Sequence, residues 1–211
     1  MTKLNKVHIQ QTLAAALSLV FSVTAFSQLT DVRFVAEEDY SFDETFFKLP
    51  AGRTIGATSG LAIHPDGSSI WVYDRCGGSD CRGSNLAPIM QFDREGNHLL
   101  SFGAKLFQRP DGLFVDRDGK VWVTDDVGSR EIDTVSEGKG HQVFKFSPEG
   151  ELLMTLGSPG ISGNGPDTFN MPSAVLVAPG GDIFVGDGHG PRSNARIVKF
   201  NSRGHYLMTW G

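Results

Sequence analysis

The chain has 211 residues, of which 39% are hydrophobic and 20% are charged. This composition excludes a disordered or collagen-like chain, and the length suits one ordinary domain or one large all-β domain. The 24 acidic residues outnumber the 19 Lys and Arg residues, so the formal charge is −5 and nucleic acid is not an expected partner. The 26 glycines exceed the roughly 7% average of proteins, which indicates many turns and favours β structure.

The first feature along the chain has the order of an export signal. Lys3 and Lys6 precede an uncharged apolar run at 13–26, and the segment Ala25-Phe26-Ser27 stands before Gln28. This order predicts a signal peptide over residues 1–27. The run is shorter than the roughly 20 residues that span a bilayer, so a retained anchor is the weaker alternative. Cleavage would leave 17 basic against 24 acidic residues, and we expect a secreted or periplasmic protein without a membrane partner.

After a lead-in segment at 28–58, one pattern of strands and turns occurs three times in residues 59–211. Each unit has an apolar strand, a tight turn, a second strand with an aromatic residue three places before an aspartate, a variable loop, and two further strands that close on a glycine. The units cover residues 59–103, 110–157 and 172–211, and the closing glycines lie 54 residues apart. That interval is in the range of four-stranded propeller blades with extended loops.

The repeat predicts the fold class. We expect an all-β protein, a β-propeller of four-stranded antiparallel blades that bury their faces by stacking. Three blades are visible, whereas propellers typically have four to eight, so the ring is incomplete in this sequence. We expect a fragment of a longer propeller; completion of the ring by partner chains is the alternative.

The two cysteines, Cys76 and Cys81, follow the second strand of the first unit. In an oxidising compartment, a disulfide across this short loop is the favoured interpretation. A metal-binding pair is the alternative, although the usual four thiolate or imidazole ligands do not cluster here.

Comparison of the units separates structural residues from candidates for chemistry. The aspartate that ends each second strand recurs, so we expect its carboxylate to accept backbone hydrogen bonds. The residues that follow it differ between units: Arg75 with the cysteine loop, Asp126 before a long segment at 127–140, and His189 in a glycine-rich loop. Loops after the second strands gather on one face of a propeller. His189 could titrate near neutral pH, whereas His141 fits a packing or capping role.

Several segments resemble the NHL-repeat propellers, and among them the peptidyl-α-hydroxyglycine α-amidating lyases and their bacterial relatives. The resemblance covers about residues 55–211 and rests on PDGL at 110–113, VWVTD at 121–125, HQVFKF at 141–146, DGH at 187–189 and NARIVKF at 194–200. It implies a six-bladed propeller with zinc in its central cavity and calcium supporting the structure. The implied reaction breaks the C–N bond of a peptidyl-α-hydroxyglycine and releases a peptide amide and glyoxylate, with zinc as a Lewis acid.

The resemblance assigns roles to individual positions. The substrate-holding arginine falls on Arg75, and two calcium-binding carbonyls fall on Leu61 and Leu113. Asp111 stands where a zinc-binding histidine is expected, and His189 stands where a proton-accepting tyrosine is expected. The other zinc histidines and the calcium-binding aspartate would lie beyond the end of this sequence.

Two functions follow as hypotheses. The first is an exported lyase-like enzyme acting on a peptide substrate, with Arg75 as substrate clamp, His189 as acid/base and Asp111 as an altered metal ligand. The second is a non-catalytic propeller that binds a peptide or another protein through the same loop face. Whether Asp111 permits metal binding, and so whether this chain is an enzyme, is left open by the sequence.

Overall fold

The computed structural model describes residues 41–126 and 138–211. The chain divides into two compact units, Met1–Asp43 and Glu44–Gly211, and the second unit is described below. The signal peptide predicted at 1–27 lies outside the described residues, as does the lead-in up to residue 40. None of the helices in the described part of the chain is long and apolar enough to cross a membrane.

The described residues form three four-stranded antiparallel sheets, each with its strands in chain order. Strands that are adjacent in the sequence pair with each other in every sheet, which is the arrangement of a propeller blade and confirms the all-β fold class. The first sheet contains β1 (Thr58–Ile63), β2 (Ser69–Asp74), β3 (Ile89–Asp93) and β4 (His98–Phe102). The second contains β5 (Pro110–Val115), β6 (Val121–Asp125), β7 (Gln142–Phe146) and β8 (Leu152–Leu156). The third contains β9 (Pro172–Val177), β10 (Ile183–Asp187), β11 (Arg196–Phe200) and β12 (Tyr206–Trp210).

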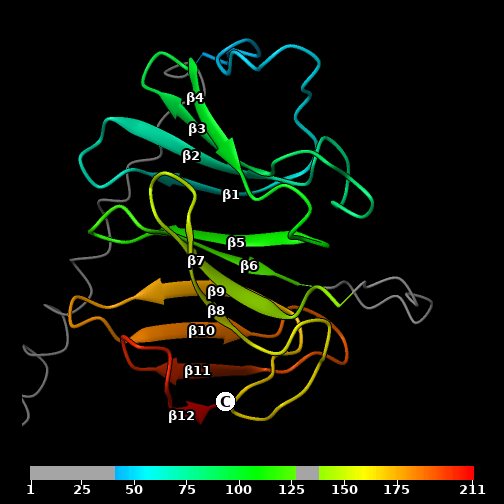
Figure 1. Ribbon diagram of the computed structural model, residues 1–211, viewed down its shortest axis with the longest axis vertical. Coiled ribbons are helices and arrows are strands. Elements are labelled where there is room, and N and C mark those ends of the chain that lie inside the picture. Colours follow the sequence, from blue (N-terminus) through cyan, green and yellow to red (C-terminus); the bar gives the residue numbers. More distant parts are fainter. Residues whose placement is uncertain (1–40, 127–137) are drawn as a thin grey trace, which may run out of the picture. The chain divides into compact units, whose positions relative to one another are not determined.

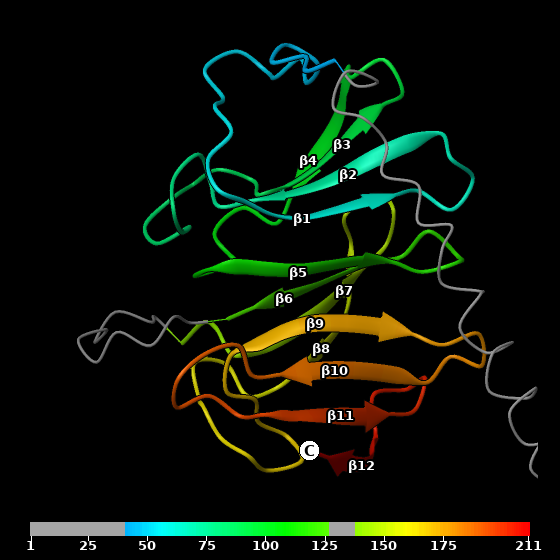
Figure 2. The same cartoon turned by 180° about the vertical axis from the view of Figure 1, so that it is seen from behind.

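The first strands of the three blades lie side by side. β5 contacts β1 on one side and β9 on the other, and the remaining strands of each blade fan away from this centre (Figures 1 and 2). Two glycines permit the close approach: a Cβ on Gly60 would lie 2.6 Å from Leu113 Cβ, and a Cβ on Gly112 would lie 2.5 Å from Ser173 O. The starts of the inner strands, and the loops beside them, are therefore held close together.

Apolar side chains fill the spaces between blades. Trp71 from β2 is fully buried in a cluster with residues of the second blade, and Trp122 from β6 is buried against the third blade. These two tryptophans occupy the aromatic position that recurs in the repeat, and their packing identifies that position as structural. The lead-in also contributes, because Phe47 and Leu49 pack on the other face of the first blade.

Candidate functional site

Side chains from all three blades meet at one end of the sheets. Arg75 directly follows β2, Asp126 directly follows β6, His189 lies in the loop after β10, and Asp111 lies near the start of β5. Asp111, Asp126 and His189 each offer an atom within 4.8 Å of the others, and we call these three residues the acid–histidine cluster. Nε2 of His189 lies 3.9 Å from Asp111 Oδ2 and 3.8 Å from Asp126 Oδ2. Three residues singled out from the sequence, Arg75, Asp111 and His189, are therefore neighbours.

Two arginines hold the carboxylates of the cluster. Arg75 donates from Nη2 to Asp111 Oδ1 at 3.2 Å and from Nε to the carbonyl of Pro110 at 2.9 Å. Arg109 donates from Nε to Asp126 Oδ1 at 2.6 Å and from Nη2 to Asp126 Oδ2, which is a bidentate pair. The Asp126 side chain is fully buried, so its charge depends on this partner, because an unpaired buried carboxylate is strongly disfavoured.

The recurring aspartate of the second blade positions this site. Asp125 Oδ1 accepts the backbone N–H of Arg109 at 2.7 Å, and both of its carboxylate oxygens accept from the N–H of Gln108. In the third blade, Asp187 likewise accepts from the N–H of Asn170 at 2.7 Å. The predicted backbone role is confirmed, although these donors come from the segment before the first strand of the same blade. Asp125 thereby fixes the backbone of the segment that contains Gln108 and Arg109 and leads into Asp111.

A short turn orients His189. Its backbone N–H and that of Gly190 both donate to Ser193 Oγ at 3.0 Å, and Asn194 continues the turn by donating to Asp187 Oδ2 at 2.7 Å. The imidazole side chain is 42% exposed, so one side of it faces the cluster and the rest reaches solvent. His141 has the capping role expected of it: its Nδ1 accepts the N–H of Met171 at 3.3 Å.

Burial alters the acidity of the carboxyl groups. It raises the pKa of Asp111, and the negative charge of Asp126 raises it further, while His189 and Arg75 act in the opposite direction. Burial raises the pKa of Asp125 to about 7. Asp111, a carboxyl group with a raised pKa, lies beside the His189 imidazole, and such a pair is suited to proton transfer or to binding a cation.

A buried phenol adjoins the same groups. Tyr73 is fully buried, and its hydroxyl has no hydrogen-bond partner among the described residues. Burial raises its pKa well above the usual value, and the charges that also act on it are those of Asp125, Asp126, Asp111 and Arg75. The hydroxyl is therefore within electrostatic reach of the charged groups of the site. A buried polar group usually has a partner, and a water or ion held by the carboxylates would supply one.

The donor set of the cluster fits a divalent cation. Carboxylate oxygens and an imidazole nitrogen are ligand types that zinc accepts, and they lie close enough to share one ion. Arg109 competes with such an ion for Asp126 Oδ2, whereas Arg75 binds Oδ1 of Asp111 and leaves Oδ2 facing His189. Leu61 on β1 and Leu113 on β5 lie on adjacent inner strands, and calcium binding by their carbonyls stays a prediction.

The cysteine loop stands next to this site. Cys76 and Cys81 form a disulfide, which confirms the predicted bond and excludes the metal-pair alternative. The carbonyl of Arg75 accepts the N–H of Gly78 at 2.9 Å inside the same loop. The loop closed by the disulfide thus begins at Cys76, directly after Arg75.

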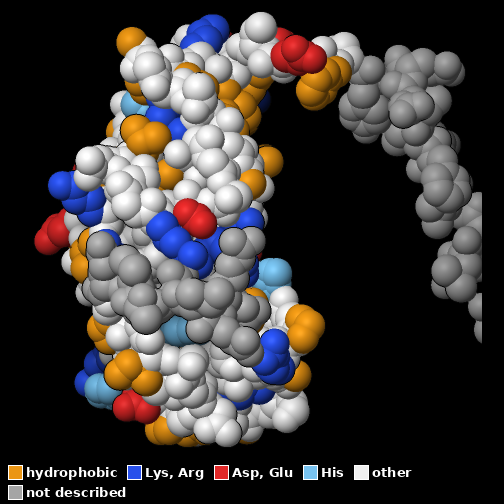
Figure 3. Space-filling model, turned by 90° about the vertical axis from the view of Figure 1, so that its right-hand side faces the viewer, with side chains coloured by type: hydrophobic (Ala, Val, Ile, Leu, Met, Phe, Trp, Pro, Cys, Tyr) orange, Lys and Arg blue, Asp and Glu red, His pale blue; other side chains and the backbone are white. Residues whose placement is uncertain are grey.

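On this end of the blades, basic and acidic side chains adjoin each other, with histidine beside them (Figure 3).

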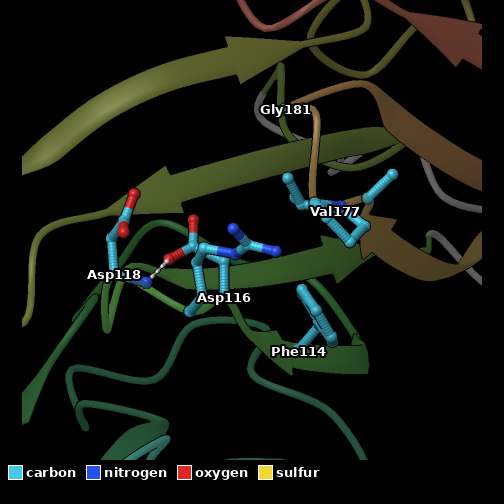
Figure 4. A pocket seen from close by; sticks show the side chains of 8 residues that line it. Phe114, Asp116, Asp118, Val177 and Gly181 are labelled. Carbon is cyan, nitrogen blue, oxygen red and sulfur yellow. Dashed lines mark hydrogen bonds between the residues drawn. The ribbon is translucent and has the colours of Figure 1, made fainter.

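Another hollow, of about 270 Å³, lies at the opposite end of the strands between the β5–β6 and β9–β10 turns (Figure 4). Its buried acid, Asp116, accepts from the N–H groups of Asp118 and Lys120 at 3.0 and 2.9 Å and from Trp122 Nε1 at 2.9 Å. This carboxylate is occupied in holding the turn and the blade-packing tryptophan, so we assign the hollow a structural role.

Sequence reasoning found only part of this site. It placed Asp126 in a variable loop without a role, and it missed Arg109. Arg109 lies two residues before Asp111, and Asp126 directly follows a recurring aspartate. The available signal was a charged residue close to a residue already singled out: Arg109 near Asp111, and Asp126 next to the recurring aspartate.

The fold and the site define a protein of propeller blades with an arginine-paired acid–histidine cluster on its loop face. No family model matches the chain. It is 33% identical over 170 residues to a probable peptidyl-alpha-hydroxyglycine alpha-amidating lyase of Caenorhabditis elegans, covering 74% of this chain and 44% of the relative. It is 39% identical over 194 residues to the peptidylglycine alpha-amidating monooxygenase of Rattus norvegicus, covering 84% of this chain and 18% of the relative.

Other similar proteins include NHL repeat-containing protein 3 of Mus musculus, 31% identical over 160 residues, with 74% of this chain and 41% of the relative covered. A solved streptogramin B lyase is 18% identical with a TM-score of 0.49, covering 76% of this chain and 42% of that one. The chain is a homologue of the NHL-repeat peptidyl-α-hydroxyglycine α-amidating lyases, as the sequence motifs indicated. It spans less than half the length of the curated relatives that it matches.

Proposed function

We propose that this chain carries the loop face of an exported, metal-dependent lyase that breaks the C–N bond of a peptidyl-α-hydroxyglycine. The observation that supports the proposal best is the meeting of Arg75, Asp111, Asp126 and His189, which come from three separate blades. Homology to the lyases supplies the reaction class, and the residues at this point supply the groups that such a reaction needs.

Each residue has a distinct task in the proposed reaction. Arg75 offers a planar guanidinium that can bind the substrate carboxylate through parallel hydrogen bonds. His189 takes the proton of the substrate hydroxyl as the C–N bond breaks, and it returns a proton to the departing amide nitrogen. The products are a peptide amide and glyoxylate, so atoms and charge balance without an added reactant.

Asp111 and Asp126 would hold the cation, which we propose to be zinc. When bound, zinc supplies Lewis-acid polarisation of the substrate oxygen. We also propose that the carbonyls of Leu61 and Leu113 contribute to a calcium site between β1 and β5. Export is part of the proposal, and the Cys76–Cys81 disulfide supports it because such bonds persist in oxidising compartments.

The test is the release of glyoxylate from α-hydroxyhippurate by the purified protein with zinc added. We expect turnover by the wild type and a loss of about 100-fold or more in kcat for His189→Phe, since positioned acid/base groups contribute on that scale. Replacing the exposed hairpin residue His205 by phenylalanine serves as the matched control and should leave turnover unchanged. Absence of glyoxylate from the wild type with zinc would contradict the proposal.

One observation favours the non-catalytic alternative. Each carboxylate of the cluster is already paired with an arginine, so the site is complete in charge without an ion. A protein of this second kind would bind hippurate, a carboxylate-bearing peptide mimic, and release no glyoxylate from the hydroxylated compound.

A further inference from the structure

The two arginines at the site are held differently. Arg75 contacts one oxygen of Asp111 and is also tied to the Pro110 carbonyl. Arg109 contacts both oxygens of Asp126, and its own carbonyl accepts the N–H of Asp126 at 3.1 Å. The Arg109 side chain is 23% exposed, so part of it reaches solvent, while its backbone N–H is held by Asp125.

Charge balance couples these pairs to any bound cation. Two aspartates and two arginines sum to no net charge, whereas a divalent ion would raise the sum to two positive charges. A cation close to both guanidinium groups is repelled by them. Asp111 can offer Oδ2, which faces His189 while Oδ1 binds Arg75. In Asp126 the oxygen that faces His189 at 3.8 Å, Oδ2, is the one that accepts from Arg109 Nη2, so an ion shared with His189 would compete with that hydrogen bond.

We propose that a divalent cation displaces Arg109 from Asp126, and that the freed guanidinium then joins Arg75 in binding the carboxylate of the ligand. Arg109 is thus a second carboxylate-binding residue that the cation releases. The inference rests on the cation site of the proposed function and goes beyond it by making carboxylate binding depend on the cation. The charges of Asp111, Asp126 and Arg75 also act on the buried hydroxyl of Tyr73, which has no hydrogen-bond partner among the described residues, and a buried polar group usually has a partner.

The direct test is calorimetric titration of the full chain with hippurate, with and without zinc. We expect zinc to tighten hippurate binding by about tenfold or more, and hippurate to tighten zinc binding by the same factor, because coupling of two binding events is reciprocal. Glyoxylate is titrated in parallel. Enhancement with hippurate alone would identify a peptidyl ligand, enhancement with both would identify the carboxylate as sufficient, and enhancement with neither would overturn the proposal.

Variants distinguish two roles for Arg109: a guanidinium that the cation displaces, and a side chain that only holds Asp126 in place. In Arg109→Met we expect tighter zinc binding, because the competitor for Asp126 is gone, together with an enhancement of hippurate binding of about twofold or less. A purely supporting role predicts weaker zinc binding instead, and that result would overturn the proposal. Arg109→Lys keeps the charge without the bidentate fork and should fall between the wild type and Arg109→Met in both measurements. Arg203→Met, in the exposed β11–β12 turn, is the matched control and should behave as the wild type.

The outcomes also separate this inference from the proposed function. Zinc binding with glyoxylate release but no change in hippurate affinity would overturn the coupling alone. Failure of the wild type to bind zinc would overturn both. If Arg109→Met does not fold, the wild-type titrations and the Arg109→Lys variant still test whether zinc and hippurate binding are coupled.

Discussion

Arg75 of the first blade binds Asp111 of the second, with Nη2 lying 3.2 Å from Oδ1. The same guanidinium donates from Nε to the carbonyl of Pro110, so one side chain contacts two successive residues at the start of β5. The Arg75 and Asp111 side chains are 21% and 14% exposed, which places the contact at the edge of solvent. Arg75 is therefore a link between blades and also a donor within reach of a ligand.

Replacing Arg75 by methionine should affect binding more than stability. We expect hippurate affinity to fall by about tenfold or more, since the substrate loses a charge-assisted hydrogen-bonding partner. The free energy of unfolding should fall by only about 1 kcal/mol, because the ion pair is partly exposed to solvent. Calorimetry and urea denaturation measure the two quantities. Equal hippurate affinity in the variant and the wild type would contradict the assigned role.

The close approach of the inner strands should make Gly112 intolerant of a side chain. In Gly112→Ala the new Cβ would lie 2.5 Å from Ser173 O, so β5 and β9 must separate, and we expect a loss of about 2 kcal/mol or more, in the range for overpacking. Gly180→Ala is the control, because a Cβ there meets nothing within 4 Å. Thermal and urea denaturation of both variants provide the comparison. A Gly112→Ala protein as stable as Gly180→Ala would show that the strands do not pack as described.

Asp125 should make stability depend on pH. Burial raises its pKa in the folded chain to about 7 from the usual value of 3.8, so between these two pH values the folded state holds a proton that the unfolded state has released. The unfolding free energy contributed by this group is therefore present below pH 4 and is lost as pH rises toward 7. The slope reaches at most about 1.4 kcal/mol per pH unit. Urea denaturation with a chelator present should show that slope in the wild type and a shallower one in Asp125→Asn. Parallel pH profiles would contradict the raised pKa.

The Cys76–Cys81 disulfide should contribute modestly to stability. For so short a loop the chain-entropy contribution is about 2 kcal/mol, and we expect reduction, or the Cys76→Ser/Cys81→Ser double variant, to lower the unfolding free energy by about that amount or less. Hippurate affinity should fall as well, because the loop begins next to Arg75. Thiol titration verifies that the disulfide is reduced. Unchanged stability and unchanged hippurate affinity after reduction would show that the disulfide supports neither the fold nor Arg75.

The repeat carried most of the information about the fold. An aromatic residue three places before an aspartate, followed by hairpins that close on glycine, was enough to predict four-stranded blades, because each such element has a local pattern. The Arg109–Asp126 pair has no such pattern. It depends on the segment before β5 and the end of β6 lying side by side, which is a consequence of packing that sequence spacing does not encode. The packing of Phe47 on the first blade was likewise hidden, since the lead-in lacks the repeat.

The central claim, that Asp111 and Asp126 together hold a divalent cation, is tested most directly by zinc titration of the purified chain after treatment with a chelator. We predict one equivalent of zinc bound by the wild type, and binding at least about tenfold weaker in both Asp111→Asn and Asp126→Asn, with circular dichroism confirming that both variants are folded. Asp118→Asn, in the exposed part of the β5–β6 turn, should bind zinc as the wild type does. Zinc affinities that are equal in the wild type, Asp111→Asn and Asp126→Asn would contradict the claim.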